Sequence, residues 1–294
     1  MPQVRANGID IEYQSFGREG DPLIVLIMGF AAQLIFWPES LCEGLAARGF
    51  RVVRFDNRDI GLSTHLTDLG APDIGALYEK AASGLKPEAP YSLSDMADDA
   101  VGLMDALGVD RAHVLGVSMG GMIAQELVLA RPERVSSLHL ACTFARPDPY
   151  VLALNAAWRE MRLGLGREST LRTLGLWLFS PTTYADRPEL IEALLQNSLA
   201  NPYPQSLVGF LRQGEAVAGH DALDRLPAVR CPTLVTVAED DILVPSRFAR
   251  QIVARIPGAE LKLVPGAGHG YFLERPDVFN ELSLEFIARS SRKS

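Results

Sequence analysis

One segment, His113-Val-Leu-Gly-Val-Ser118-Met-Gly-Gly-Met-Ile-Ala124, contains Gly-x-Ser-x-Gly between an apolar strand pattern and a helix pattern. A serine on a sharp strand-to-helix turn needs very small residues two positions before and after it, because the backbone is crowded there. Gly116 and Gly120 meet this need. We therefore predict a strand, a tight turn that presents Ser118 as a nucleophile, and a helix over 119–130. The alternative is a glycine-rich turn in which Ser118 only caps that helix.

Strand and helix patterns alternate along most of the chain around this segment. Asn7-Gly8 separates two strand patterns and is a strong hairpin signal. Strands that alternate with helices predict a mostly parallel sheet with helices on both faces. The eight predicted strands are 3–6, 9–16, 23–28, 51–55, 113–117, 137–142, 233–238 and 261–264, and the main predicted helices between them are 38–48, 92–107, 119–130, 246–256 and 276–288.

The alternation stops between residues 144 and 230, where no strong strand pattern occurs. Helical patterns in that stretch, near 155–163, 168–178, 188–199 and 205–217, indicate a helical insertion. We therefore predict a core domain formed by 1–143 and 231–294, and a helical cap formed by 144–230. A long loop with several glycines and prolines, 59–91, is predicted to help the cap shape the substrate pocket.

A serine nucleophile needs a base, and the chain offers five histidines. His113 and His139 lie within apolar strand patterns, and His65 lies in an early loop. His269 lies in a glycine-rich loop directly after the last predicted strand, where its side chain can reach the carboxyl edge of the sheet. We predict His269 as the base, with His220 as the second choice. The non-catalytic alternative is a loop histidine bonded to a backbone carbonyl.

The base needs a carboxylate that orients it. Glu239-Asp240-Asp241 follows the strand predicted at 233–238. We predict Asp241 as the orienting residue and Asp240 as the second choice, while the remaining acids would cap a helix or lie in solvent. The chain order Ser118, Asp241, His269 is the one expected for a serine nucleophile on this kind of sheet.

Backbone N–H groups are predicted to bind the negative charge that develops on the substrate oxygen. One is the N–H of Met119, directly after the nucleophile, and the other is the N–H of Phe30, in the loop after strand 23–28. The alternative is that Gly29-Phe30 is only a tight turn. Four residues are also predicted to contact the substrate: Gly29, Trp158, Trp177 and Phe179. The alternative for each side chain is ordinary packing.

Composition narrows the range of partners. The formal net charge of −8 argues against nucleic acid. No apolar run reaches the roughly 18 residues that a membrane span needs, and the N-terminal residues show no apolar signal region. Cys42, Cys142 and Cys231 are an odd, scattered set without metal-ligand spacing. We expect a cytoplasmic monomer or homodimer with reduced thiols, a small-molecule substrate and no metal, cofactor or membrane partner.

Five motifs together resemble the α/β-hydrolase superfamily across nearly the whole chain. They are Met28-Gly29-Phe30, Asp56-Asn-Arg58-Asp-Ile-Gly61-Leu-Ser63, Gly116-Val-Ser118-Met-Gly120-Gly121, Asp241-Ile-Leu-Val-Pro245 and Gly268-His269. The first two, with Asp110-Arg-Ala-His-Val, look like the branch of aclacinomycin methylesterase and related bacterial carboxylesterases, which includes enzymes that act on polyketides; esterases that open macrolide lactones look similar too. The resemblance implies an α/β-hydrolase fold with a mostly parallel eight-stranded sheet and a helical cap.

Two positions depart from the motifs of many relatives. Met28 stands where many have histidine before the oxyanion loop, and Asp59 stands where many have the first glycine of Asp-x-Arg-Gly-x-Gly-x-Ser. The first change concerns the shape of the loop and leaves catalysis intact. The second makes the local turn different from that of the relatives.

The sequence thus predicts a serine carboxylic-ester hydrolase that acts on an apolar ester or lactone, with polyketides and macrolides among the candidates. Two alternatives use the same triad, namely a cofactor-free perhydrolase or haloperoxidase and a carbon–carbon bond hydrolase. A non-catalytic ligand-binding homologue is the alternative from another class, and the complete set Ser118, Asp241 and His269 argues against it. Dehalogenases and epoxide hydrolases of this superfamily use aspartate at the elbow, so Ser118 argues against both.

Overall fold

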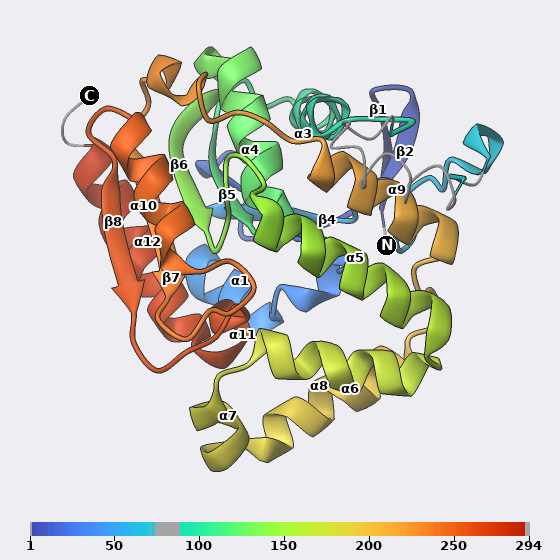
Figure 1. The fold of residues 1–294 in the computed structure, drawn as a ribbon. Coiled ribbons are helices and arrows are strands. Elements are labelled where there is room, and N and C mark those ends of the chain that lie inside the picture. The colour runs from blue at the N-terminus through green and yellow to red at the C-terminus, as the bar shows by residue number, and fades with distance from the viewer. Residues whose placement is uncertain (1, 71, 74–88, 292–294) are drawn as a thin grey trace.

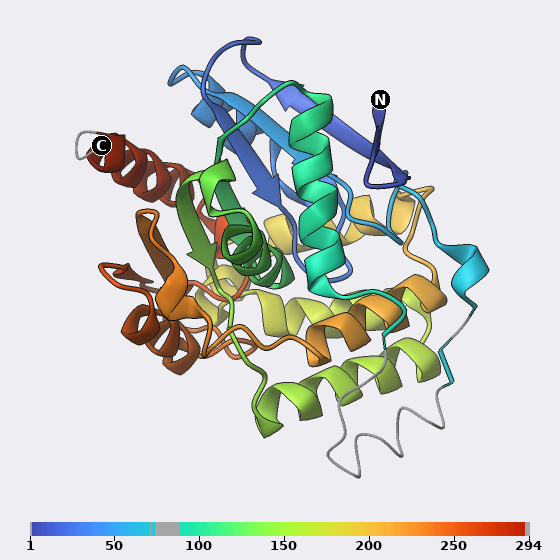
Figure 2. The same cartoon turned by 90° about the horizontal axis from the view of Figure 1, so that it is seen from above.

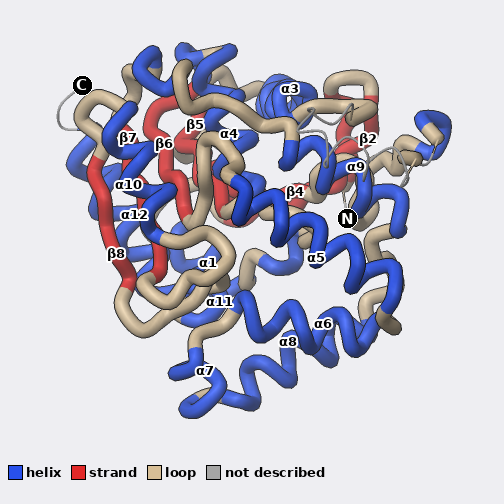
Figure 3. Tube along the Cα trace, viewed as in Figure 1, coloured by secondary structure: helices blue, strands red, loops and turns tan. Residues whose placement is uncertain are grey.

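The computed structural model describes residues 2–70, 72–73 and 89–291. Eight strands form one sheet in the order β1-β2-β4-β3-β5-β6-β7-β8. β1 pairs with β2 and β2 with β4 in antiparallel fashion, and every other neighbouring pair is parallel. The predicted eight-stranded, mostly parallel sheet is confirmed (Figures 1 and 3). The strands are β1 Gln3–Ala6, β2 Ile9–Phe16, β3 Leu23–Ile27, β4 Arg51–Phe55, β5 Ala112–Val117, β6 Val135–Ala141, β7 Thr233–Ala238 and β8 Glu260–Val264.

The apolar runs of the sequence become the central strands. Every residue of β3 and of β4 is buried, as expected for strands covered on both faces. At the edge, Asn7 and Gly8 form the turn between β1 and β2, both with positive φ, 45° and 78°. Positive φ at both central residues is the geometry of a tight hairpin turn that follows the twist of its strands.

Helices cover both faces of the sheet (Figure 2). One apolar cluster joins the strands to helices on one face, and a second cluster joins them to helices on the other face. Ser92 and Asp95 form the predicted reciprocal cap at the start of α3. The helices of the first face are α3 Leu93–Ala106, α4 Met119–Ala130 and α10 Ser246–Arg255, and those of the second face are α1 Glu39–Ala46, α11 Tyr271–Glu274 and α12 Pro276–Ser291.

The stretch 144–230, called the helical segment below, contains a further set of helices beside the sheet (Figure 1). The four predicted helical patterns correspond to α5, α6, α8 and α9, and the short α7 was not predicted. The division of the chain into a core and a cap stays a prediction. The helices of the segment are α5 Pro149–Gly164, α6 Arg167–Leu178, α7 Pro181–Asp186, α8 Pro188–Ala200 and α9 Leu207–Ala218.

Asp59 occupies a position in the turn after β4 where many relatives have glycine. Asp59 has a φ of 64°, a left-handed conformation that glycine adopts more easily. Its carboxylate accepts a hydrogen bond from the Leu66 N–H at 2.8 Å and lies 3.3 Å from the Arg212 guanidinium of α9. Both side chains are only 2% exposed. The aspartate therefore connects the turn after β4 to the helical segment, which a glycine could not do.

The predicted 59–91 loop is described only in part, because residues 71 and 74–88 lie outside the described residues. Among the residues that are described, no helix is both long and apolar enough to cross a membrane.

Candidate active site

Ser118 lies on the sharp turn between β5 and α4. Its φ of 56° and ψ of −120° are strained for a residue with a side chain, and a conformation of this kind costs about 1–3 kcal/mol. A Cβ at position 116 would lie 2.2 Å from the Gly120 carbonyl oxygen, and one at position 120 would lie 2.0 Å from the Ile27 carbonyl oxygen. Only glycine fits at both positions, as the sequence predicted.

Hydrogen bonds from neighbouring strands fix this turn. The Ser118 N–H donates to the Ala141 carbonyl of β6 at 2.9 Å, and the Thr143 hydroxyl donates to the Ser118 carbonyl at 2.7 Å. The backbone on both sides of the serine is therefore bonded, which keeps the strained conformation in place.

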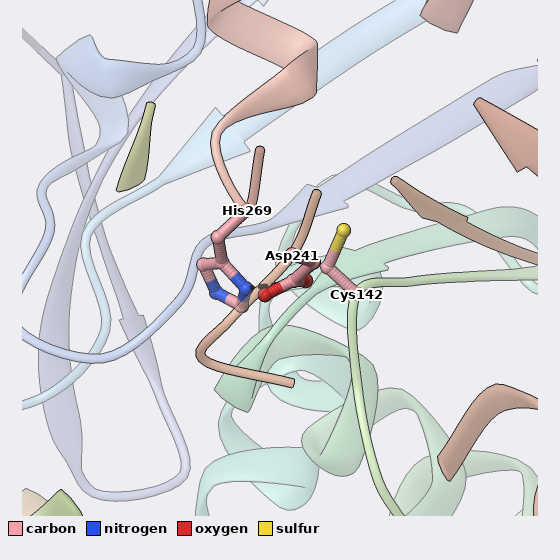
Figure 4. Close-up of side chains that lie close together, drawn as sticks. All are labelled: Cys142, Asp241 and His269. Carbon is pink, nitrogen blue, oxygen red and sulfur yellow. Dashed lines mark hydrogen bonds and ion pairs between the residues drawn. The ribbon is translucent and has the colours of Figure 1, made fainter. Parts of the chain in front are cut away.

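Asp241 and His269 are brought together at the carboxyl edge of the sheet. The His269 Nδ1 lies 2.8 Å from the Asp241 Oδ2, and both side chains are buried (Figure 4). The Oδ1 atom of Asp241 accepts hydrogen bonds from the N–H groups of Leu243 and Val244 at 2.9 and 2.8 Å. Asp240 is exposed, and its N–H donates to a backbone carbonyl. The geometry therefore pairs His269 with Asp241 and not with Asp240.

The other four histidines have different surroundings, and none of them lines the two cavities at Ser118 that are described below. His139 is enclosed between Ser283 and Thr236, and burial lowers its pKa to about 3. Burial also lowers the pKa of His113 to about 4. His220, the second choice, lies 3.3 Å from the Glu126 carboxylate. Of the five, His269 alone is placed beside both the cavities and a candidate orienting acid.

The Ser118 hydroxyl and the His269 ring border the same cavities but form no direct hydrogen bond in this conformation. Such bonds are often long in enzymes without substrate and shorten in the reactive complex. Ser118 and His269 are therefore neighbours across a cavity.

The backbone around Phe30 and Met119, whose N–H groups are the predicted oxyanion donors, lies close to Ser118. A Cβ on Gly29 would lie 3.2 Å from the Ser118 Cβ, so the loop that carries Phe30 runs directly past Ser118. Within the described part of the chain, the N–H groups of Phe30 and Met119 donate to no protein acceptor. The N–H of the next loop residue, Ala31, donates to the Gln213 side chain of α9 at 3.2 Å, which fixes the loop from the outside.

Cys142 is a neighbour of the histidine–aspartate pair that sequence spacing did not reveal. Its sulfur, the Asp241 carboxylate and the His269 ring offer three possible metal ligands within 4.8 Å of one another, all buried (Figure 4). Burial, followed by the nearby Asp241 charge, raises the pKa of the Cys142 thiol well above its usual value. Metal ligation needs a thiolate, so this environment favours a neutral thiol packed against Asp241.

Glu274 is the second residue that sequence reasoning missed. Its carboxylate is 1% exposed and accepts hydrogen bonds from the Gly268 N–H at 2.7 Å and the Ser180 hydroxyl at 2.8 Å. The Thr183 hydroxyl of α7 donates to the same carboxylate. Glu274 therefore links the loop of His269 to the helical segment. Its position five residues after His269 and two before Pro276 was the available signal.

Two cavities open beside Ser118. The larger has a volume of about 540 Å³ and is lined mainly by apolar side chains of α6 and α8, together with Gly29 and Phe179. The smaller has a volume of about 70 Å³. Trp158 lines both, whereas Trp177 lines neither and stacks on Trp158 with ring centroids 5.8 Å apart. Of the predicted substrate contacts, Gly29, Trp158 and Phe179 thus face a cavity and Trp177 supports one of them.

A family model described as the alpha/beta hydrolase fold matches residues 22–276. The chain belongs to the α/β-hydrolase family. This confirms the resemblance to the superfamily that the sequence motifs showed, and the departures at Met28 and Asp59 lie within the matched range.

The relatives of this α/β-hydrolase have names of several kinds. The chain is 33% identical to RutD of Azorhizobium caulinodans, which is named as a candidate carbamate hydrolase. The alignment spans 287 residues and covers 97% of this chain and 98% of the relative. The chain is 30% identical to BpoC of Mycobacterium tuberculosis, named as a candidate non-heme bromoperoxidase, over 95% of this chain and 98% of the relative. A solved thermophilic esterase from Thermogutta terrifontis matches with a TM-score of 0.79 at 26% identity, over 99% of both chains. The chain is thus a hydrolase of this family with esterases among its relatives.

Proposed function

We propose that this α/β-hydrolase is a serine carboxylic-ester hydrolase that acts on an apolar ester or lactone. The observation that carries the proposal is the pairing of His269 with Asp241 at 2.8 Å beside the cavities that Ser118 borders. The strained turn under Ser118 supports it, because backbone strain of this kind is maintained at reactive residues.

The mechanism that we propose is acyl transfer through a covalent intermediate. His269 accepts the hydroxyl proton of Ser118 as the oxygen attacks the substrate carbonyl, and it then protonates the leaving alcohol. Asp241 accepts the Nδ1–H bond of the imidazole, which selects the tautomer and stabilises the imidazolium. Water activated by His269 then cleaves the acyl-enzyme. All proton transfers in this sequence pass through His269, so no metal or cofactor is required.

The N–H groups of Phe30 and Met119 are proposed to bind the oxyanion. Phe30 belongs to the loop after β3 and Met119 is the first residue of α4, and neither N–H is used within the described part of the chain. Loss of one donor of this type typically costs about 2.7–4 kcal/mol of transition-state stabilisation.

The helical segment is proposed to act as the cap that encloses the substrate. Its helices α6 and α8 supply leucine and isoleucine side chains to the larger cavity, including Leu171, Leu174 and Leu195. An apolar lining favours an apolar acyl or alcohol group, because burial of apolar surface contributes about 25 cal/mol per Å².

A labelling experiment tests the triad. A fluorophosphonate probe should attach to Ser118, the Ser118→Ala variant should not be labelled, and hydrolysis of p-nitrophenyl esters should fall about a million-fold in that variant. Full activity in Ser118→Ala would disprove the proposal. Labelling of the wild type without turnover of any ester would leave a serine enzyme with another substrate.

The name of RutD favours one second candidate, hydrolysis of a carbamate. A carbamate carbonyl is bonded to nitrogen as well as oxygen, so the same serine could attack it, although the nitrogen makes the carbonyl less electrophilic. Matched p-nitrophenyl esters and carbamates of one chain length separate the two. A higher kcat/KM for the carbamate would replace the ester assignment.

The name of BpoC favours a test of perhydrolysis, in which peroxide replaces water as the acyl acceptor. The test compares peracid formation and acid formation from one ester in the presence of hydrogen peroxide. Preferential peracid formation at millimolar peroxide would make perhydrolysis the main activity.

A further inference from the structure

The two cavities beside Ser118 meet at the proposed nucleophile. Four residues border both of them: Phe30, Ser118, Trp158 and His269. A carbonyl attacked by Ser118 therefore lies where the cavities join, and its two substituents can extend in two directions. The site offers one direction toward α6 and α8 and another toward α4 and α5.

Aromatic rings lie where the two cavities adjoin. The Phe30 and Trp158 rings stack with centroids 5.6 Å apart and an interplanar angle of 12°. Phe210 and Trp177 extend this stack on its two sides, at 4.7 Å from Phe30 and 5.8 Å from Trp158. Four rings packed in this way resist displacement, because moving one would expose its neighbours. The size difference between the two cavities is therefore built into the aromatic packing.

The smaller cavity is lined by side chains from several elements of the fold. Met122 of α4, Val217 of α9 and Phe144, which follows β6, line it, and they are at most 8% exposed. Leu154 of α5 and Val244 of the loop that carries Asp241 line it as well. With about 10–15 Å³ needed for each water-sized group, its 70 Å³ accommodates about five to seven non-hydrogen atoms.

We propose that this enzyme selects substrates that are asymmetric about the reacting carbonyl, with a bulky apolar group on one side and a group of at most about seven non-hydrogen atoms on the other. The inference rests on the proposed esterase function and narrows its substrate class. Methyl or ethyl esters of bulky acids meet the requirement, and so do acetates of bulky alcohols. A large-ring lactone carries bulk on both sides of its carbonyl and does not meet it.

A matrix of esters tests this size rule. It combines acetyl, butyryl and naphthoyl acyl groups with methyl, butyl and naphthylmethyl alkoxy groups, and kcat/KM is measured for each by acid release. In at least one of the two small-group series, the methyl esters or the acetates, we expect kcat/KM to exceed that of the ester that is bulky on both sides by tenfold or more. A single misfitting methylene already changes kcat/KM by about 10–200-fold. Rates within about threefold across the matrix would overturn the rule.

Enlarging the smaller cavity should relax the selection. Leu154→Ala is expected to raise kcat/KM for an octyl-sized group, which exceeds the size limit, relative to the methyl-sized group by about tenfold. Val217→Ala is the second enlargement, in case the first variant folds poorly. Leu152→Ala, on the same helix with a side chain 45% exposed, is the matched control and should leave the ratio unchanged. An unchanged ratio in both enlarged variants would overturn the assignment of the small group to this cavity.

The failure of the size rule can be told apart from the failure of the proposed function. If no ester is hydrolysed and Ser118 is not labelled by fluorophosphonate, the function is wrong and the size rule fails with it. If esters are hydrolysed and Ser118 is labelled but bulk on both sides is tolerated, only the size rule fails.

Discussion

The carboxyl edge of the sheet and the helical segment meet at Ser118, but they are built differently. At the sheet edge, backbone groups fix the reactive residues: two N–H groups bind Asp241, and a strand carbonyl accepts the N–H of Ser118. In the helical segment, side chains line the cavities, and many residues of α5, α6 and α8 are half-buried or exposed. For the proposed esterase, the chemistry should therefore depend on backbone geometry and the substrate range on side-chain volume. Changes at the sheet edge should therefore abolish activity, whereas changes in the segment should alter selectivity.

After Ser118→Ala, the largest effect is expected from Asp241→Asn. The amide cannot replace the carboxylate as acceptor of the His269 N–H without reorienting, so kcat should fall about ten-thousand-fold. Steady-state kinetics on any accepted ester measures this. Asp240→Asn is the matched control and should have little effect, because its side chain is exposed. A larger loss in the control would show that the neighbouring acid orients the histidine.

Gly120→Ala should be the most damaging small substitution. Its Cβ would lie 2.0 Å from the Ile27 carbonyl oxygen of the central sheet, and overpacking of this kind costs about 1–3 kcal/mol or more. Gly164→Ala in α5 meets nothing within 4 Å and should increase stability by up to about 1 kcal/mol. Urea unfolding measures both free energies. Equal changes in the free energy of unfolding for Gly120→Ala and Gly164→Ala would contradict the distinction between the sheet edge and the helical segment.

Glu274→Gln probes the place where the two regions are joined. The glutamine amide can accept only part of the hydrogen bonds from Gly268, Ser180 and Thr183, so the loop of His269 should shift. A small misplacement of a reacting group can lower kcat about tenfold to a hundredfold, with little change in KM. Glu281→Gln on the exposed side of α12 is the control. A lower melting temperature with normal kcat would assign Glu274 a purely structural role.

His139, in β6 of the sheet, should give the smallest effect, which is a pH dependence of stability. Burial lowers its pKa to about 3, below the unfolded value of about 6.5. The unfolded chain therefore binds the proton first, and stability falls as the pH decreases from about 6.5 toward 3. At pH 5.5 the loss amounts to about 1.4 kcal/mol.

The measurement is the free energy of unfolding between pH 7.5 and 5.5 for the wild type and His139→Gln. The variant should show a shallower decrease than the wild type. Identical slopes in the two proteins would assign the acid sensitivity to other groups.

The sequence predicted the sheet edge well because its requirements are local and steric. Gly116 and Gly120 could be read from the motif alone, and the structure shows the contacts that demand them. The predicted bounds of β2, β4 and β7 match those of the structure. β4 and β7 are buried along their whole length, as expected for strands covered on both faces. His269 could be selected because it alone followed the last strand in a glycine-rich loop.

The residues that the sequence did not predict are those defined by contacts between distant parts of the chain. Glu274 binds Ser180 and Thr183 of the helical segment, and Cys142 lies beside Asp241 from another strand end. Trp177 was expected to touch the substrate, but it stacks behind Trp158 because helix α6 presents it on that side. No local pattern encodes such neighbours, so only the fold could reveal them.

The buried pair between Asp59 and Arg212 gives the molecule a fixed side and an entrance side. Moving α9 away from the sheet would separate two charges that are each 2% exposed, and leaving such a charge alone costs about 3–5 kcal/mol. The far end of the segment, where α6 and α8 line the larger cavity, carries ion pairs at half-exposed side chains such as Arg172 and Glu192, which cost little to break. Substrate and product should therefore pass between α6 and α8. Product release should become faster as the salt concentration rises, because salt weakens the exposed ion pairs there but not the buried pair of Asp59 and Arg212.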